Sequence, residues 1–376
     1  ANHPEAFLAA CMSLAMNNTD KLAALRQEAG RLAIRVLPPD INRSGADFTL
    51  EHDGGKLCIR YALAAVKRVG MAAMRTLVET RGHAPFEDLA DLATRIDPRQ
   101  LNKMQLESLA RAGAFDSLDS NRARMFAAAD TVLRRAHAGA EEKQSGQIGL
   151  FAGGNRPEPL RLPEIPDWEP LDRLGFEAEA VGFHLTAHPL DAYRQVLSRL
   201  KVIPSTQLEA TAQAGSARVK LAGTVVNSKE RITRTGSRMA WVRLSDAGGS
   251  YEVTFFSEVL SKAREILAAG SAVLVTADIR LEGESLRVTA VDASSLEQVV
   301  ARAGTGMRIW LQQTGAVEHI RALLEREGRG TGQVVLVPRL DQAQQVEIAL
   351  PGRFNVNPRL AQALKLVAGV ERIEDI

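Results

Sequence analysis

The sequence predicts a multidomain α+β protein, and three patterns along its 376 residues predict it. Apolar residues recur at helical spacing over residues 62–140, alternate with polar residues over 219–291, and follow mixed strand and helix periods over 305–376. A composition of 45% hydrophobic and 24% charged residues, with a formal net charge of +2, is typical of a globular protein. The apolar runs are too short for a membrane helix, so membrane-spanning classes are excluded.

The cysteines indicate the cellular compartment of the protein, and the first residues indicate its place in a longer chain. Cys11 and Cys58 lie far apart among apolar neighbours, which predicts two buried thiols in a cytoplasmic protein rather than a disulfide or zinc site. The first residue is Ala1, and an amphipathic helix follows directly. We therefore expect the chain to be part of a longer protein.

Residues 1–135 are predicted to be mainly helical. Two helices and a short strand precede Pro38-Pro39, and a β-hairpin follows with its turn at Asp53-Gly54-Gly55. Gly82 and Gly113 stand where helices are expected to end. The candidate helices after the hairpin are Met71–Arg81, Phe86–Arg95, Asn102–Ala112 and Asn121–Ala138.

The turn Lys67-Arg68-Val69-Gly70 is the first candidate site, because it lies between two apolar helical segments. Two helices joined by a tight glycine turn resemble a helix-hairpin-helix, which presents backbone N–H groups to a phosphate. Lys67 and Arg68 would add positive charge there. The alternative is a plain helical hairpin capped by glycine. A second turn, residues 111–115, favours a glycine-capped helix end over a paired hairpin.

Residues 136–215 are interpreted as a linker with short helices, because residues 141–170 are rich in Gly, Pro and Gln and have no sustained period. Within it, Gln147, Leu150 and Phe151 have the spacing of the peptide that binds the bacterial sliding clamp. Large apolar side chains without a local core are typical of a docking peptide. The alternative is that Leu150 and Phe151 attach the linker to a neighbouring domain.

Residues 216–296 are predicted to form a β-barrel. Alternating strands begin at Val219, Ala240 and Tyr251; a helix follows from Val259, and two more strands cover Ala272–Ile279 and Ser285–Val291. Three strands, one helix and two strands is the order of an OB-fold, a five-stranded Greek-key barrel.

The first hairpin of this barrel is strongly basic. Glu230 is the one acidic residue among seven basic ones in residues 218–244. Four of the seven flank the hairpin loop, which is a nucleic-acid-binding edge in OB-folds: Lys229, Arg231, Arg234 and Arg238. Trp241 and Phe256 are predicted to face away from the core and to stack on bases. The alternative is a solvated basic loop whose aromatic residues are covered by a neighbouring domain.

Residues 305–376 follow a β-α-β-β-α-β order, the split βαβ arrangement. Elsewhere, His184 and His188 have the spacing of two metal ligands on a helix, but Gly182 and Pro189 argue against a helix there. The sequence has no Walker-type loop, nucleophile elbow or paired aspartates on a strand. It therefore predicts no catalytic residue, metal site or cofactor within this segment.

Together these segments resemble the alpha subunit of bacterial DNA polymerase III, the replicative C-family DNA-directed DNA polymerase. The most specific stretches are residues 17–22 (NNTDKL), 37–42 (LPPDIN), 61–70 (YALAAVKRVG), 106–116 (LESLARAGAFD), 182–193 (GFHLTAHPLDAY) and 238–258 (RMAWVRLSDAGGSYEVTFFSE). The resemblance implies a C-terminal portion that lacks the palm, its catalytic carboxylates and its Mg²⁺. It also departs from the family at Arg68, where a glycine is usual.

The resemblance gives each part a function. Residues 1–135 would be the distal fingers with the duplex-binding hairpin, and residues 136–215 would carry the clamp-binding motif. Residues 216–296 would bind single-stranded template, and residues 305–376 would meet the tau subunit of the clamp loader. Two alternatives remain: a damage-tolerant C-family relative, and a non-catalytic OB-fold module that binds RNA or tRNA.

Overall fold

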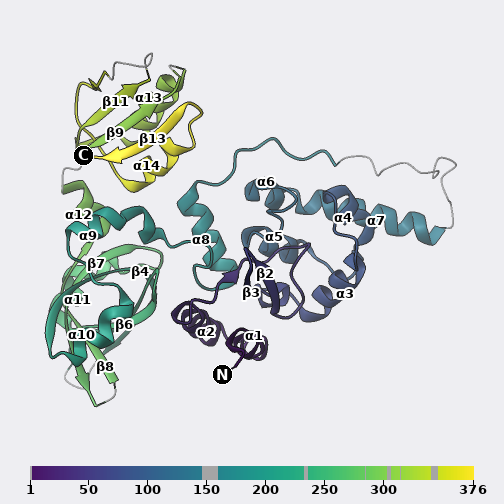
Figure 1. Ribbon diagram of the computed structural model, residues 1–376, viewed down its shortest axis with the longest axis horizontal. Helices are drawn as coiled ribbons and strands as arrows, with labels where there is room; N and C mark the ends of the chain where they lie inside the picture. Colours follow the sequence, from purple (N-terminus) through teal and green to yellow (C-terminus); the bar gives the residue numbers. More distant parts are fainter. Residues whose placement is uncertain are drawn as a thin grey trace. The chain divides into compact units, whose positions relative to one another are not determined.

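The structure, a computed structural model, describes residues 2–145, 160–232, 236–283, 285–302, 306–313, 315–339 and 346–376 (Figure 1). It divides into two compact units, residues 1–187 and residues 188–376. The first is largely helical, and the second contains a closed five-stranded barrel and a separate four-stranded sheet. The predicted multidomain α+β class is therefore confirmed.

The first unit begins with two helices and a small sheet. The sheet has the order β1-β3-β2, with the predicted hairpin formed by β2 and β3. Tyr61, directly after β3, is fully buried and meets the Phe48 ring edge-on at 4.9 Å between centroids. The elements are α1 (Pro4–Leu14), α2 (Thr19–Arg31), β1 (Val36–Leu37), β2 (Thr49–Asp53) and β3 (Lys56–Arg60).

Five helices then surround one apolar core. Their starts follow local sequence: Asp88, Asn102 and Asn121 each accept a hydrogen bond from the backbone N–H three residues later. The predicted helix over residues 121–138 is two helices that meet at Ala128, which is fully buried. The helices are α3 (Met71–Arg81), α4 (Leu89–Arg95), α5 (Lys103–Arg111), α6 (Arg122–Ala127) and α7 (Ala129–Ser145).

Residues 160–187 return to the same unit. Trp168 packs between Phe126 and Phe176, with ring centroids 5.7 and 4.4 Å away. The helix α8 (Pro170–Val181) follows and contacts α5. Both described ends of the segment that contains residues 146–159 therefore belong to the first unit.

The barrel of the second unit closes in the order β4-β5-β6-β8-β7. Its interior holds alternate residues of each strand, as the period of two predicts, among them Leu221, Val242 and Val253. Short helices over residues 189–213, which precede the first strand in the sequence, pack against the barrel. The elements are η2 (Pro189–Tyr193), α9 (Arg194–Arg199), η3 (Ser205–Gln207), α10 (Leu208–Gln213), β4 (Ala217–Ile232), β5 (Arg238–Asp246), β6 (Gly249–Phe255), α11 (Ser257–Ala263), η4 (Arg264–Ile266), β7 (Ala272–Glu282) and β8 (Ser285–Ser295).

The remaining elements are a helix after the barrel and a four-stranded sheet with two helices. After α12 (Leu296–Arg302), the four-stranded sheet has the order β12-β11-β9-β13. Residues from both of its helices share one core with Ile309 and Leu336, so the helices cover the same face of the sheet. The elements are β9 (Met307–Leu311), α13 (Ala316–Glu327), β10 (Arg329–Gly332), β11 (Val334–Pro338), β12 (Ile348–Ala349), α14 (Pro358–Lys365) and β13 (Val370–Asp375).

Candidate nucleic-acid interface

The predicted hairpin turn joins a short 3₁₀ helix, η1 (Leu63–Ala65), to α3. The N–H of Val69 donates to the Val66 carbonyl at 3.2 Å, which closes the turn. Gly70 is the N-cap residue of α3, and among the described residues no side chain caps this helix start. The first N–H groups of α3 are thus without a side-chain acceptor, as an anion-binding helix N-terminus requires.

Arg68 adopts a backbone conformation that usually belongs to glycine. Its φ is +65°, in the left-handed region, and its side chain is exposed. A residue with a Cβ pays about 1–2 kcal/mol for this conformation. The turn therefore has an arginine at a position whose left-handed backbone a glycine would adopt without this cost.

Lys67 is held by the end of α8. Its N–H donates to the Ala180 carbonyl at 2.8 Å. A Cβ on Gly182, whose φ is +104°, would come within 3.1 Å of the Lys67 ammonium nitrogen. The ammonium therefore lies at the C-terminus of α8, where the helix dipole stabilises a cation. Lys67 accordingly has a structural contact beside the role predicted from sequence.

The second turn, at Gly113, ends α5 rather than forming an open hairpin. The N–H groups of Gly113 and Ala114 donate to the Ala110 and Leu109 carbonyls at 3.0 and 2.9 Å. Gly113 has a φ of +81°, so these bonds form a Schellman cap. The interpretation of this turn as a glycine-capped helix end is therefore confirmed.

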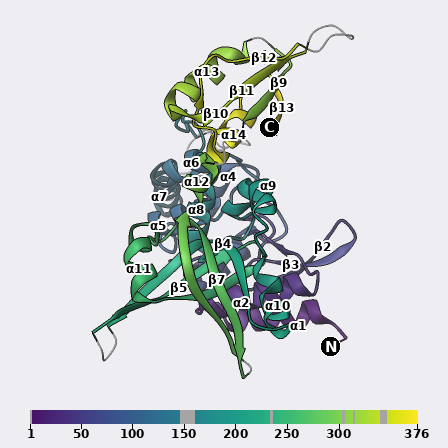
Figure 2. The same ribbon diagram turned by 90° about the vertical axis from the view of Figure 1, so that its left-hand side faces the viewer.

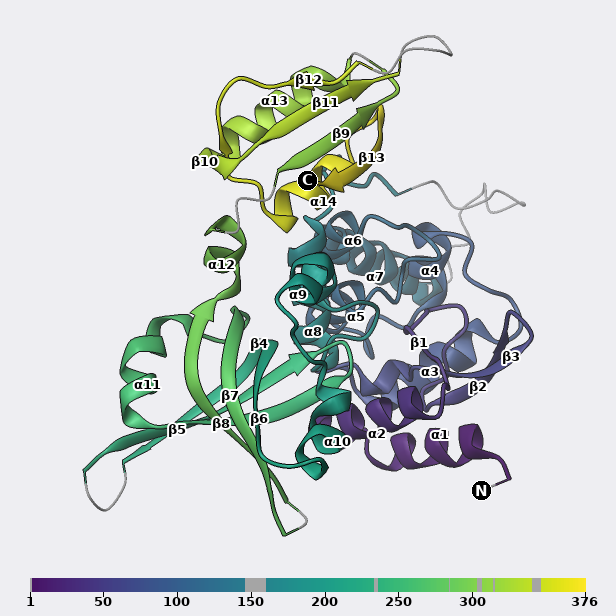
Figure 3. The same cartoon turned by 60° about the vertical axis from the view of Figure 1, so that its left-hand side comes forward.

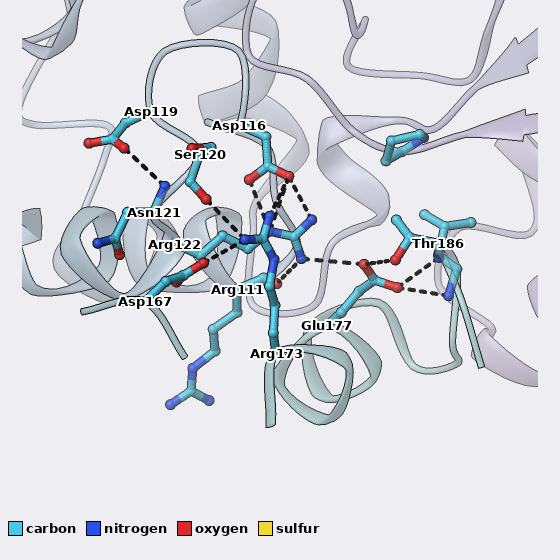
Figure 4. Close-up of polar contacts among 12 residues, drawn as sticks. Arg111, Asp116, Asp119, Ser120, Asn121, Arg122, Asp167, Arg173, Glu177 and Thr186 are labelled. Atoms are coloured by element: carbon cyan, nitrogen blue, oxygen red, sulfur yellow. Dashed lines mark hydrogen bonds and ion pairs between the residues drawn. The ribbon is translucent and has the colours of Figure 1, made fainter. Parts of the chain in front are cut away.

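Arg122 occupies the space beside this cap (Figure 4). Its Nε and Nη2 donate to the two carboxylate oxygens of Asp116 at 2.9 and 2.7 Å, and its Nη1 donates to Glu177 at 3.3 Å. The side chains of Arg122 and Glu177 are 5% and 1% exposed. This is a buried ion pair, and it joins α6 to α8.

Glu177 also orders the segment after α8. One carboxylate oxygen accepts hydrogen bonds from the N–H groups of Leu185 and Thr186, both at 2.9 Å, and the other accepts from the Thr186 hydroxyl at 2.7 Å (Figure 4). Arg173 adds a second bridge, because it donates to Asp116 and to Asp167. Buried and partly buried charges thus fasten residues 167–186 to the helical unit.

The basic hairpin of the barrel is a long arm, here called the β4–β5 arm, comprising residues 227–232 and 238–243 (Figure 2). Lys229 and Arg231 are exposed on it and have no ion pair among the described residues. Arg238 lies 4.0 Å from Glu230, which is held more tightly by Arg264 at 3.0 Å. Arg234 lies outside the described residues.

Both predicted aromatic residues face away from the barrel core. Trp241 alternates with the buried residues Ala240 and Val242, and it is half-buried beside its cross-strand partner Lys229. Phe256, the residue before α11, is 47% exposed. On an exposed sheet face, an indole can stack on a base, and a neighbouring ammonium can neutralise the phosphate of the same nucleotide.

Sequence reasoning missed three exposed arginines of the barrel domain. Arg264 on η4 bonds Glu230, and Arg280 and Arg287 lie on the hairpin formed by β7 and β8. The alternation of β7 and β8 predicts that Arg280 and Arg287 face outward, so the sequence held a signal for these two.

Other predicted sites have simpler outcomes. Gln147, Leu150 and Phe151 lie outside the described residues. His188 caps η2 and contacts the Ser245 hydroxyl at 3.1 Å, whereas burial lowers the pKa of His184. Within the described ranges, no group of three or more His, Cys, Asp and Glu residues could hold a metal. No helix there is long and apolar enough to cross a membrane.

Two family models match the chain where the structure shows these features. A helix-hairpin-helix model matches residues 33–125, and an OB-fold nucleic acid binding domain model matches residues 219–296. DNA polymerase III subunit alpha of Caulobacter vibrioides is 39% identical over the whole chain, and that of Bacillus subtilis is 30% identical over 95% of it.

The chain belongs to the DNA polymerase III alpha-subunit family. The Escherichia coli K12 alpha subunit is 28% identical and also covers all of the chain. The chain spans about a third of the length of these alpha subunits. Among solved structures, yeast mitochondrial single-stranded DNA binding protein Rim1 matches 21% of this chain and 95% of its own, at 22% identity and a TM-score of 0.19. That score is too low to add to the assignment.

Proposed function

We propose that this chain is the C-terminal portion of a replicative DNA polymerase III alpha subunit and that it binds duplex DNA through the turn Lys67-Arg68-Val69-Gly70. The uncapped start of α3 carries this proposal. Its free N–H groups suit one phosphate, and the exposed guanidinium of Arg68 suits the same backbone. Such contacts are independent of base sequence and weaken as salt rises.

The barrel is proposed to guide single-stranded template. Lys229, Arg231, Arg234 and Arg238 would contact phosphates, and Trp241 and Phe256 would stack on bases. The exposed cations of the β4–β5 arm and its outward-facing indole support this role. The polymerase activity is proposed for the whole protein, in the cytoplasm, with catalytic carboxylates and Mg²⁺ in a palm outside this chain.

Two protein partners complete the proposal. Gln147, Leu150 and Phe151 would bind the sliding clamp, and residues 305–376 would bind the tau subunit. Clamp tethering makes rebinding to DNA intramolecular, which raises the effective concentration of the primer end. A pull-down with purified clamp tests the first contact: changing the three residues to alanine should abolish capture. Undiminished capture would show that the clamp binds elsewhere.

The duplex contact is tested with the full chain and a labelled primed DNA. Arg68→Gly keeps the left-handed turn but removes the charge, so we expect roughly two- to fivefold weaker binding and a salt slope reduced by about one. Arg321→Ala removes the same charge from an exposed position on α13 and should change neither quantity. Equal effects of the two variants would refute the hairpin contact, and preference for structured RNA over primed DNA would favour the RNA-binding alternative.

A further inference from the structure

In the hairpin of β7 and β8, two arginines lie directly opposite each other, which is unfavourable for strand pairing. Arg280 and Arg287 are direct cross-strand partners, and both face outward because their neighbours Ile279 and Val288 are buried in the barrel. Like charges directly opposite each other destabilise a β-ladder. We call residues 279–282 and 285–288 the β7–β8 arm; it runs past the closed part of the barrel (Figure 3).

A single carboxylate holds both guanidinium groups. Arg280 Nη2 lies 2.5 Å from one oxygen of Glu282, and Arg287 Nε lies 2.9 Å from the other. The three side chains are 42–56% exposed, so each ion pair contributes little net free energy and is easily exchanged. Two guanidinium groups thus share one carboxylate.

Strand register connects this cluster to the β4–β5 arm. Lys229 pairs with Trp241, Trp241 with Thr254, and Thr254 with Thr289 across the seam that closes the barrel. All four residues alternate with buried neighbours or lie beyond the core, so their side chains form one row on the outer face. Arg287 precedes Thr289 by two residues and therefore faces the same way.

The row spans four adjacent strands, and neighbouring strands lie about 4.8 Å apart, so the two basic arms are separated by roughly 15 Å along it. That is the length of a few nucleotides of extended single strand. The row begins with an ammonium and an indole, continues with two hydroxyl groups, and ends beside a guanidinium pair. Base stacking is thus available at one end and phosphate binding at both.

We propose that Arg280 and Arg287 form a second phosphate-binding site for single-stranded nucleic acid, in which a phosphate of the strand replaces Glu282 as their shared acceptor. This inference rests on the proposed role of the barrel. A phosphate fits the cluster because guanidinium forks bind its oxygens in the geometry that they use for a carboxylate. Binding also neutralises the repulsion between the opposed arginines. Glu282 offsets the repulsion between the two arginines while no strand is bound and competes with the incoming phosphate.

The test measures binding of the full chain to a labelled oligothymidylate of about 15 nucleotides, a length within the site sizes of OB-folds. Arg280→Ala and Arg287→Ala should each weaken binding roughly two- to fivefold, and the double variant should lower the salt slope by about 0.7 per lost phosphate contact. Glu282→Gln should act in the opposite direction and tighten binding by a similar factor, because the competing charge is removed.

Matched controls come from the exposed pair Arg321–Glu325 on α13. Arg321→Ala and Glu325→Gln make the same charge changes away from the barrel and should leave binding as it is. If Arg287→Ala weakens binding no more than Arg321→Ala, or if Glu282→Gln does not tighten it, the second site is refuted while the barrel still binds DNA. If the unaltered chain does not bind the oligonucleotide at all, the proposed role of the barrel fails, and this site fails with it.

Discussion

The guanidinium of Arg122 lies where a Cβ on Gly113 would be. Gly113 also has a φ of +81°, so the helix cap and the buried arginine both depend on the missing side chain. Gly113→Ala should therefore destabilise the first unit by at least about 1–2 kcal/mol, from the left-handed backbone alone. Displacement of Arg122 adds to this loss.

Gly30→Ala is the matched control, because Gly30 lies within α2 and a Cβ added there would meet no other atom within 4 Å. That change should stabilise the unit by up to about 1 kcal/mol through helix propensity. Both variants are compared by urea unfolding read by hydrogen-exchange mass spectrometry on peptides from residues 100–130. A Gly113→Ala protein as stable as the unaltered chain would contradict the packing described.

Removing one partner of the buried Arg122–Glu177 pair is predicted to lower the free energy of unfolding strongly. Arg122→Met leaves Glu177 and Asp116 without their buried partner, and we expect a loss of roughly 3–5 kcal/mol. Adding Glu177→Gln should recover part of it, because one unpaired charge is then removed. Unfolding free energies of the two single variants and the double variant give the coupling directly.

The Arg124–Asp119 pair, which is more exposed, provides the comparison for the Arg122–Glu177 variants. Arg124 is bound bidentately to Asp119 but is more exposed, with a 35% exposed side chain. Arg124→Met should cost no more than about 1 kcal/mol. Similar losses for Arg122→Met and Arg124→Met would mean that burial does not govern these pairs.

The stability of the first unit should depend on pH through His184. Burial lowers the pKa of His184, and Arg26 lowers it further, while Glu177 and the Leu174 carbonyl oppose the shift. A histidine that is neutral when folded binds more protons when unfolded, so stability is complete above its ordinary pKa of about 6.5 and falls as the pH decreases below it.

His184→Gln should flatten this dependence between neutral pH and the carboxylate range, as measured by urea unfolding across pH. The carboxylates do not confuse the result. Arg60 and Arg124 lower the pKa values of Glu51 and Asp119, so their contributions are lost only in more acidic solution, as the pH falls through those lowered values. A slope unchanged by His184→Gln would exclude this histidine as its source.

Two buried tyrosines should respond oppositely to loss of their hydroxyl groups. The Tyr251 hydroxyl donates to the Ala222 carbonyl at 3.0 Å inside the barrel, so Tyr251→Phe should cost about 1 kcal/mol. The Tyr61 hydroxyl is buried and has no hydrogen-bond partner in the part of the chain that the structure describes, so Tyr61→Phe should be neutral or stabilising. Unfolding of each unit, followed through its own peptides, compares the two, and equal costs would contradict these assignments.

Much of the fold follows from local sequence. Asn102 and Asn121 mark helix starts because their side chains accept hydrogen bonds from the helix N-terminus, and alternation from Ala240 to Leu244 reports which strand face is buried. The sequence does not indicate that α6 and α7 separate at Ala128, because the helical spacing of apolar residues continues through this position. Local pattern reports periodicity and not the angle at which helices meet.

The candidate sites were predictable where one segment carries them. The turn at Gly70 and the basic arm around Lys229 are each contiguous, so residue types and spacing suffice. The cluster of Arg280, Arg287 and Glu282 depends on register between two strands, and the bond from Lys67 to Ala180 joins distant segments. Such contacts are set by tertiary packing, which no window of sequence contains.

The return of residues 160–187 to the helical unit has a mechanical consequence. Ser145 is the last residue of α7 in this unit, and the side chain of Leu160 packs against the core of the same unit. Any partner attached to Gln147–Phe151 would therefore pull on two anchors in one body. Under tension the load would divide between α7 and the segment that Leu160 and Trp168 hold against the unit, so neither end would resist the full force of a moving partner.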